Sequence, residues 1–195
     1  MSARTLKWFV ILACLGPVGW MLWGAFGGGD LGPDPVKGLQ VVTGLSAIVL
    51  LLLSLVITPL RRHLKWNWSQ PLRRVFGLAA FGYVLRHAVI YFVFDQGLDP
   101  GSIWADTVEH PRIAVGFISF LMLIPLALTS TDAAIRRLGK RWGRLHRLAY
   151  LATGLGLIHY LMVQKLDVRD ALPYLGVFAV LMLARLAGRR VVPAR

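Results

Sequence analysis

The sequence predicts an all-α membrane protein, a polytopic bundle of about six transmembrane helices. Of its 195 residues, 56% are hydrophobic and only 16% are charged, and the mean hydropathy is +0.62. A soluble domain of this length carries more charge, about a quarter of its residues. The apolar residues also form blocks of the length that a membrane helix needs, roughly 20 residues. We therefore expect residues 1–195 to form one compact bundle without a separate soluble domain.

Six apolar blocks are long enough to be membrane spans, and polar, glycine-rich or proline-containing segments separate them. The predicted spans are Trp8–Phe26, Leu39–Leu60, Leu72–Phe94, Ile113–Thr129, Leu145–Val163 and Leu172–Ala187. The first block follows two basic residues, as a signal peptide does, but it is too long and no small-residue cleavage site follows it. The second and sixth blocks are plain aliphatic sequence. The fourth contains Pro125, and neighbouring membrane helices can accommodate such a kink.

The distribution of charge predicts how the bundle is oriented. Most of the 22 Lys and Arg residues fall near the two termini and in the second and fourth connections, whereas the nine Asp and Glu residues, except Asp132, lie in or beside the other loops. Because cytoplasmic loops of membrane proteins are rich in Lys and Arg, we expect both termini on the cytoplasmic side. The net charge of +13 is first a mark of topology and second a candidate surface for anionic lipid or an acidic partner. It does not indicate nucleic-acid binding.

Three histidines fall within the predicted spans. His87 lies in the third span beside Arg86, and His146 and His159 lie in the fifth, whereas His63 and His110 lie in polar loops. An ionisable side chain in hydrocarbon costs several kcal/mol and is a functional candidate by default. Neutral imidazole is also the commonest metal ligand.

The topology places His87 and His159 at similar depth, in the outer half of the bilayer. Two imidazoles that face each other from neighbouring helices are the ligands that a six-coordinate heme iron needs. Zinc fits less well, because no Cys, Asp or Glu lies at that depth to complete a tetrahedral shell. Arg86 is a candidate to balance a heme propionate, although a phospholipid headgroup would be an equally good partner.

His146 belongs to a different depth. On a continuous helix it would lie about 20 Å further inside than His159 and be rotated by about 220°. The third span has no second histidine near Arg73 or Arg74 to pair with it. The alternatives for His146 are a heme with a weak or non-histidine second ligand, a different cofactor or quinone, and a structural or proton-handling role.

Several motifs resemble the MsrQ family, formerly called YedZ, of the ferric-reductase-like transmembrane group. They are Thr129-Ser130-Thr131, Arg137–Trp142, Leu145-His146, Ile158–Leu161, Asp34–Lys37, Thr43-Gly44 and His87. The resemblance covers nearly the whole chain. It implies a multi-pass protein of the bacterial inner membrane that binds heme b and flavin mononucleotide (FMN), with His87, His146 and His159 as ligands of heme iron.

The resemblance also implies an electron-transfer subunit without catalytic residues of its own. Electrons would come from the quinol pool or a cytoplasmic flavin reductase and would pass through heme to MsrP, a periplasmic molybdenum-dependent methionine sulfoxide reductase, in support of the repair of oxidised periplasmic proteins. The acidic outer loops could form the docking face for this partner, through Asp30, Asp34, Asp95, Asp99, Asp106 and Glu109.

Two other functions are compatible with the histidines. A stand-alone transmembrane ferric or metal reductase would use the same residues without a protein partner. A transporter could use them to relay protons, but six short spans without an inverted repeat disfavour that class. The sequence shows no nucleophile elbow or phosphate loop that would indicate another enzyme.

Overall fold

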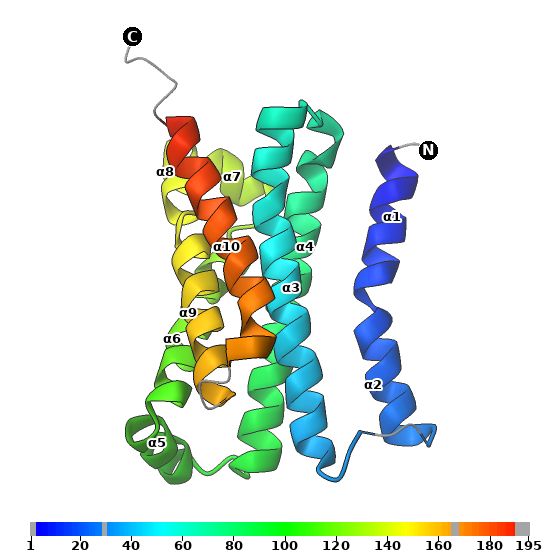
Figure 1. The fold of residues 1–195 in the computed structure, drawn as a ribbon, viewed down its shortest axis with the longest axis vertical. Coiled ribbons are helices and arrows are strands. Elements are labelled where there is room, and N and C mark those ends of the chain that lie inside the picture. The colour runs from blue at the N-terminus through cyan, green and yellow to red at the C-terminus, as the bar shows by residue number, and fades with distance from the viewer. Residues whose placement is uncertain (1–2, 29–30, 165–167, 190–195) are drawn as a thin grey trace.

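The structure of the protein is a computed structural model that describes residues 3–28, 31–164 and 168–189. Within those residues every regular element is a helix, which confirms the predicted all-α membrane bundle (Figure 1). Four helical segments in the described part are long and apolar enough to cross a membrane, namely Thr5–Phe26, Pro35–Leu64, Asn67–Asp95 and Pro111–Leu128. Asp30, one of the predicted docking residues, lies outside the described residues.

The helices follow the predicted spans, with short helices added between them. The elements are α1 (Ala3–Cys14), α2 (Gly16–Phe26), α3 (Pro35–Leu64), the 3-10 turn η1 (Asn67–Ser69), α4 (Gln70–Ile90), the π-helical turn η2 (Tyr91–Asp95), α5 (Pro100–Glu109), α6 (Pro111–Leu128), α7 (Asp132–Leu138), α8 (Lys140–Leu145), α9 (Leu148–Val163) and α10 (Val168–Arg189). The first predicted span is divided into α1 and α2 at Leu15, just before Pro17, which cannot donate a helical hydrogen bond.

The fifth predicted span begins later than the sequence pattern indicates. The helix starts at Leu148 and has 16 residues, and His146 lies in the turn between α8 and α9. A second break precedes α8 at Gly139, whose φ of 50° is easily reached only by glycine. His146 and His159 are therefore not carried by one continuous helix.

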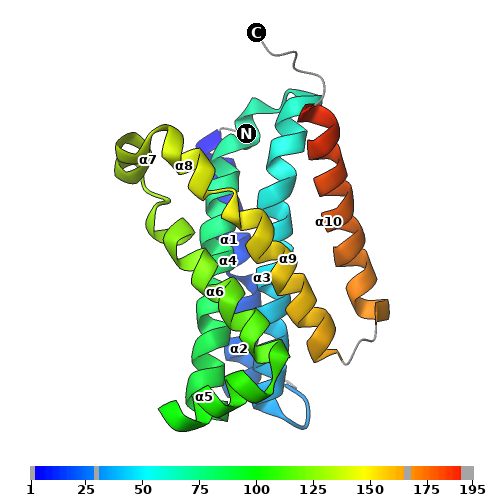
Figure 2. The ribbon, with the colours of Figure 1, turned by 90° about the vertical axis from the view of Figure 1, so that its left-hand side faces the viewer.

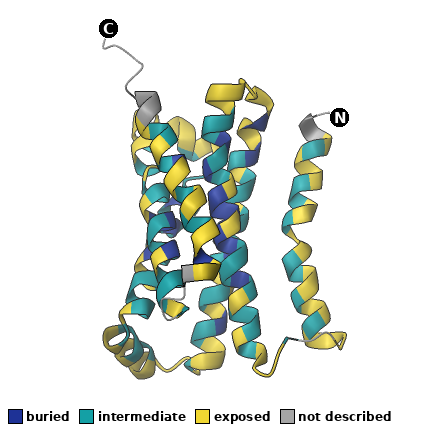
Figure 3. Ribbon diagram, viewed as in Figure 1, coloured by how far each residue is buried: buried dark blue, intermediate teal, exposed yellow. Residues whose placement is uncertain are grey.

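Two packed helix pairs form the centre of the bundle. The antiparallel α3 and α4 make the longest contact, and α6 packs along α9. The α10 helix lies beside α3 and α9, and α1 and α2 pack against α4 and α3 on another side (Figures 1 and 2). The buried residues concentrate on the inner faces of this arrangement (Figure 3). The apolar side chains of α1 and α2, including Trp8, Phe9 and Trp23, are exposed, as expected for a helix that faces lipid.

The two ends of the bundle carry opposite charge. Figure 1 shows the α3–α4 turn, α7, α8 and the end of α10 at one end, and α5 with the α2–α3 connection at the other. We call the first the basic end; its Lys and Arg residues include Arg61, Arg62, Lys65, Arg73, Arg74, Arg136, Arg137, Lys140, Arg141 and Arg144. We call the second the acidic end; its acids include Asp34, Asp95, Asp99, Asp106 and Glu109.

Hydrogen bonds to backbone carbonyls connect the helices inside the apolar bundle. The Tyr83 hydroxyl donates to the Cys14 carbonyl at the end of α1, at 2.7 Å, and Tyr83 is only 2% exposed. The Ser119 hydroxyl of α6 donates to the Ala152 carbonyl of α9 at 2.9 Å. Such bonds matter in lipid because no water is present to satisfy a polar group.

We predict that Tyr83→Phe loosens the contact between α1 and α4. The change leaves the ring in place but removes the donor to Cys14, and a hydrogen bond between membrane helices contributes roughly 0.5–1.5 kcal/mol. The melting temperature of the purified protein in detergent should fall by a few degrees. Tyr174→Phe is the matched control, because the Tyr174 hydroxyl has no hydrogen bond within the described residues, and equal melting of the two variants would contradict the assignment.

Candidate functional site

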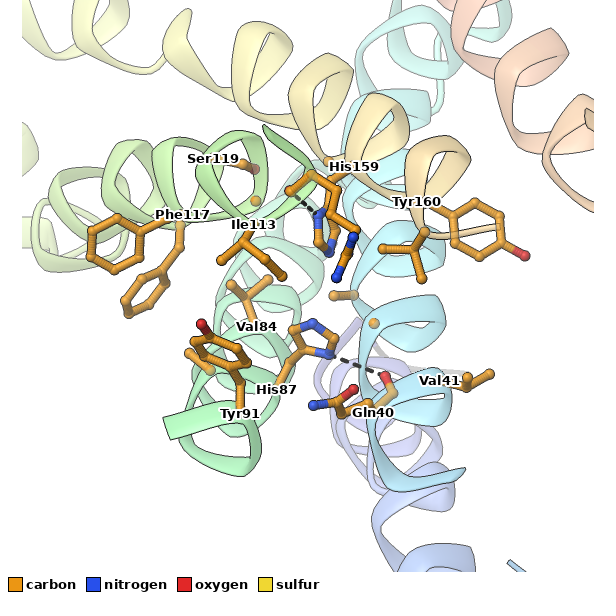
Figure 4. Close-up of a pocket in the computed structure, with 18 of the residues that line it drawn as sticks. Gln40, Val41, Val84, His87, Tyr91, Ile113, Phe117, Ser119, His159 and Tyr160 are labelled. Carbon is orange, nitrogen blue, oxygen red and sulfur yellow. Dashed lines mark hydrogen bonds between the residues drawn. The ribbon is translucent and has the colours of Figure 1, made fainter. Parts of the chain in front are cut away.

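A cavity of about 770 Å³ lies between α3, α4, α6 and α9 and reaches the acidic end (Figure 4). Apolar side chains line its depth, including those of Val84, Ile113, Phe117 and Phe120. Polar and charged side chains line its rim, including those of Lys37, Gln40, Asp95, Gln96, Asp106 and Arg112. Its volume falls in the range of sites for small molecules and cofactors, about 300–1,000 Å³.

His87 and His159 enter this cavity from opposite helix pairs. His87 projects from α4 and His159 from α9, and Figure 4 shows both rings within the cavity. The ring centroids are 6.1 Å apart and the ring planes are nearly perpendicular, at 84°. The structure thus brings together the two histidines that the predicted topology placed at similar depth.

A backbone carbonyl fixes the orientation of each ring. His87 Nδ1 lies 3.1 Å from the carbonyl oxygen of Gln40 on α3, and His159 Nδ1 lies 2.7 Å from that of Arg112 on α6. A carbonyl oxygen can only accept, so these contacts are hydrogen bonds when Nδ1 carries the proton of the neutral ring. The Thr43 hydroxyl lies 3.2 Å from His87 Nδ1 and donates to the Leu39 carbonyl, so it can accept from the same Nδ1–H. The lone pair is then on Nε2, which is the arrangement found in histidines that bind metals.

A glycine makes room for each ring on the facing helix. A Cβ atom at Gly116 of α6 would lie 2.8 Å from His159 Nδ1, a distance that no side chain tolerates, and a Cβ atom at Gly44 of α3 would lie 3.4 Å from the ring of His87. Both glycines line the cavity. The sequence motifs included Gly44, but Gly116 was not identified, because a glycine in an apolar helix is common.

The two helix pairs repeat the same spacing. The carbonyl acceptor lies 47 residues before the histidine in both cases, from Gln40 to His87 and from Arg112 to His159. In each pair the glycine also follows the acceptor by one helical turn, at Gly44 and at Gly116. This internal repeat of acceptor, glycine and histidine is the sequence signal that could have identified Gly116.

Arg86 does not line the cavity. Its side chain is exposed, donates to the Gly82 carbonyl of its own helix at 3.2 Å and lies 5.7 Å from the centroid of the Tyr83 ring. Adjacent residues on a helix point about 100° apart, so Arg86 faces outward where His87 faces inward. The basic residues that line the cavity among the described residues are instead Lys37 and Arg112.

His146 belongs to a separate cluster at the basic end. Its Nε2 lies 3.1 Å from the Thr129 hydroxyl, and its ring stacks on Trp142 with centroids 3.9 Å apart. The Trp142 indole N–H donates to the Thr129 carbonyl at 3.0 Å. The structure does not bring His146 to the cavity. His146 instead contacts Thr129 and Trp142, and all three residues belong to the motifs that carry the family resemblance.

The remaining histidines lie outside the cavity. His63 is exposed at the end of α3. His110 Nδ1 lies 2.8 Å from Asp106, whose other oxygen accepts from Tyr91 at 2.6 Å and from Gln96 at 3.1 Å. His110 thus lies in the turn between α5 and α6, as the sequence predicted, beside the polar network that joins α5 to η2 at the rim.

Most of the acids predicted as a docking face have local structural partners. Asp34 caps α3, Asp99 caps α5, Asp95 accepts from Gln40, and Asp106 belongs to the network at the rim. Glu109 is the member of this group without such a partner within the described residues. Within the same residues, no three His, Cys, Asp or Glu side chains are close enough to hold a metal ion by themselves.

Comparisons with known proteins agree with the sequence motifs. A family model described as "Ferric reductase like transmembrane component" matches residues 43–157. The chain is 45% identical to a relative from Rhodospirillum rubrum, with 91% of this chain and 85% of the relative covered. It is 42% identical to one from Caulobacter vibrioides, with 93% and 87% covered, and 44% identical to one from Deinococcus radiodurans, with 91% and 87% covered.

All three relatives are named protein-methionine-sulfoxide reductase heme-binding subunit MsrQ. No solved structure gives a significant match. The family model spans more than half of the chain, and the relatives are aligned over most of it. The chain therefore belongs to the ferric-reductase-like transmembrane family and, within it, to the MsrQ family.

Proposed function

We propose that this chain binds heme b in the cavity, where His87 and His159 would ligate the iron, and that it serves as the electron-transfer subunit of a methionine sulfoxide reductase system. The observation that carries the proposal is the pair of imidazoles in one cavity, each with Nδ1 held by a backbone carbonyl. The names of the relatives, which describe heme-binding subunits, support the same cofactor.

The residues present fit a heme between the two rings. Bonds of about 2 Å from a metal to each imidazole nitrogen put the centres of two opposed rings about 6 Å apart, and the observed separation is 6.1 Å. Gly44 and Gly116 leave the space beside the rings that a side chain would fill. Lys37 and Arg112, which line the cavity, would balance the propionates, a role for which the sequence offered Arg86 as one candidate.

When bound, the heme supplies one-electron redox chemistry. The protein's own residues orient and insulate it. The carbonyls of Gln40 and Arg112 hold the two rings and make them better electron donors to the metal. Val84, Phe117 and Phe120 exclude water from the depth of the cavity, and a low-polarity environment is one of the means by which a protein sets a redox potential.

We assign the electron donor to the basic end. Basic loops mark the cytoplasmic side of a bacterial inner-membrane protein, so a cytoplasmic flavin reductase would approach here, and the quinol pool is the alternative donor. FMN and an inner heme are proposed for the same end, by family resemblance. Since Nε2 of His146 contacts the Thr129 hydroxyl, Nδ1 is the nitrogen free to ligate a metal there. Ligation through Nε2 would require the Thr129 contact to break.

We assign the acceptor to the acidic end, where the cavity opens. The proposed partner is MsrP, the periplasmic molybdenum-containing methionine sulfoxide reductase, and the chain itself would contribute no catalytic residue. The heme cavity reaches this end, which shortens the path to a docked partner. Because most acids of this end have local partners, shape and apolar contacts are expected to contribute to docking more than carboxylate charge.

The ligand assignment predicts which histidine variants lose heme. His87→Ala and His159→Ala should each lose most of the Soret absorbance assigned to the cavity, because a six-coordinate iron would lose one of its two protein ligands. His63→Ala and His110→Ala are the controls and should retain it. The measurement is the heme-to-protein ratio with reduced-minus-oxidised spectra of the purified variants. Full heme content in His87→Ala together with His159→Ala would overturn the assignment.

Because Gly116 lies so close to the His159 ring, we predict that a substitution at Gly116 also weakens heme binding, although both histidines remain. Gly116→Ala should displace the His159 ring, since the added Cβ would lie 2.8 Å from Nδ1. We expect at least a tenfold lower heme affinity in a titration of the heme-free protein, from a misplacement worth about 1.4 kcal/mol or more. Gly176→Ala on α10 is the control, because a Cβ there meets nothing within 4 Å. Unchanged affinity in Gly116→Ala would contradict the geometry.

The electron acceptor distinguishes this function from a stand-alone ferric or metal reductase. The purified protein is reduced with dithionite in the absence of oxygen, and reoxidation is followed by the absorbance of the heme. We expect fast reoxidation by purified MsrP with methionine sulfoxide, and slow reoxidation by ferric citrate. The reverse order of rates would favour the metal reductase.

A further inference from the structure

Arg185 of α10 reaches into the bundle near the basic end and has donors without partners. Its Nη2 donates to the Leu55 carbonyl of α3 at 2.8 Å. That carbonyl is free because its helical donor would be the nitrogen of Pro59, which carries no hydrogen. The guanidinium also lies over the ring of Tyr150, 4.3 Å from its centroid. Nε and Nη1 are buried and have no hydrogen-bond partner within the described residues.

The surroundings of Arg185 add positive charge rather than a counter-charge. Arg73 of α4 and Arg62 of α3 add electrostatic repulsion at Arg185. Within the described residues, no carboxylate pairs with any of these three arginines. Asp132, an acid at the same end, pairs with Arg74 instead, at 2.6 Å. Buried N–H groups of a cation that have no acceptor are costly, even though Nη2 of Arg185 has one. The two unpaired donors of Arg185 and the two neighbouring cations therefore favour an anion from outside the chain.

We propose that Arg62, Arg73 and Arg185 form a binding site for a phosphate group between α3, α4 and α10 at the basic end. Guanidinium groups match the geometry of phosphate oxygens and are less strongly hydrated than ammonium groups, which suits a site beside apolar helices. The ligand is the headgroup phosphate of an anionic phospholipid or the phosphate of a soluble ester that reaches this end from the aqueous side. None of the three arginines lines the cavity of His87 and His159.

The contacts indicate what the bound phosphate does. Arg185 already connects α10 to α3 through Leu55, and an anion held by Arg62 and Arg73 as well would join α3, α4 and α10. Bound phosphate would relieve the repulsion among the three cations. Ligand binding should therefore raise the melting temperature of the bundle, because a ligand of the folded state stabilises it by mass action.

The test uses the full chain in dodecyl maltoside micelles, which contain no phosphate. The melting temperature is followed as phosphatidylglycerol is added to one sample series and FMN to another. We expect a saturable rise with at least one of the two probes. In Arg62→Gln/Arg73→Gln the half-saturating concentration should increase at least about tenfold, the loss expected for charge-assisted hydrogen bonds. This double variant leaves the bond from Arg185 to Leu55 in place, so it tests binding without removing that contact.

Arg61→Gln/Arg136→Gln is the matched control. It removes the same number of charges from exposed side chains of the basic end and should keep the half-saturating concentration of the unmodified protein. A response to phosphatidylglycerol alone supports a lipid headgroup as the ligand, and a response to FMN alone supports a soluble phosphate ester. The absence of a saturable rise with either probe, or an equal loss in the control, overturns the proposal.

Discussion

The site depends on one kind of contact, the hydrogen bond from each half-buried histidine to a backbone carbonyl on the neighbouring helix. This contact fixes the ring, its tautomer and the nitrogen that faces the cavity. A backbone acceptor is more rigid than a side-chain acceptor, because its position is set by the helix itself. The packing of α3 with α4 therefore also positions His87, and the packing of α6 with α9 positions His159.

The equal spacing in the two helix pairs explains how such a cavity arises from simple parts. Each pair contributes one carbonyl, one glycine and one histidine, and the two sets meet across the cavity. Neither pair alone can surround a planar cofactor. The proposed function thus needs both pairs, and the family match from residue 43 to residue 157 includes residues of all four helices.

The sequence was sufficient to predict the helical membrane bundle and the shared depth of His87 and His159, because both follow from apolar block length and helix direction. It was not sufficient for Arg86, since the direction of a side chain on an apolar helix depends on which face is packed, and this helix has apolar residues all round. The start of α9 was also missed. The His146 ring at this turn contacts Trp142, one helical turn earlier, and the hydroxyl of Thr129, which follows the end of α6.

The basic end departs from the repeat, and this departure gives the two ends different chemistry. The number of residues from Gly44 to Gly116 equals the number from Arg74 to His146. At the position of α4 that corresponds to His146 the chain therefore has an arginine instead of a second inner histidine. Arg74 pairs with Asp132, whereas its neighbour Arg73 and Arg185 repel each other electrostatically. Clustered arginines favour anions, whereas a pair of neutral imidazoles is suited to the metal that we propose for the cavity. In these proposals α4 contributes His87 to the cofactor site, α3 and α4 contribute Arg62 and Arg73 to the phosphate site, and the other helices complete each site.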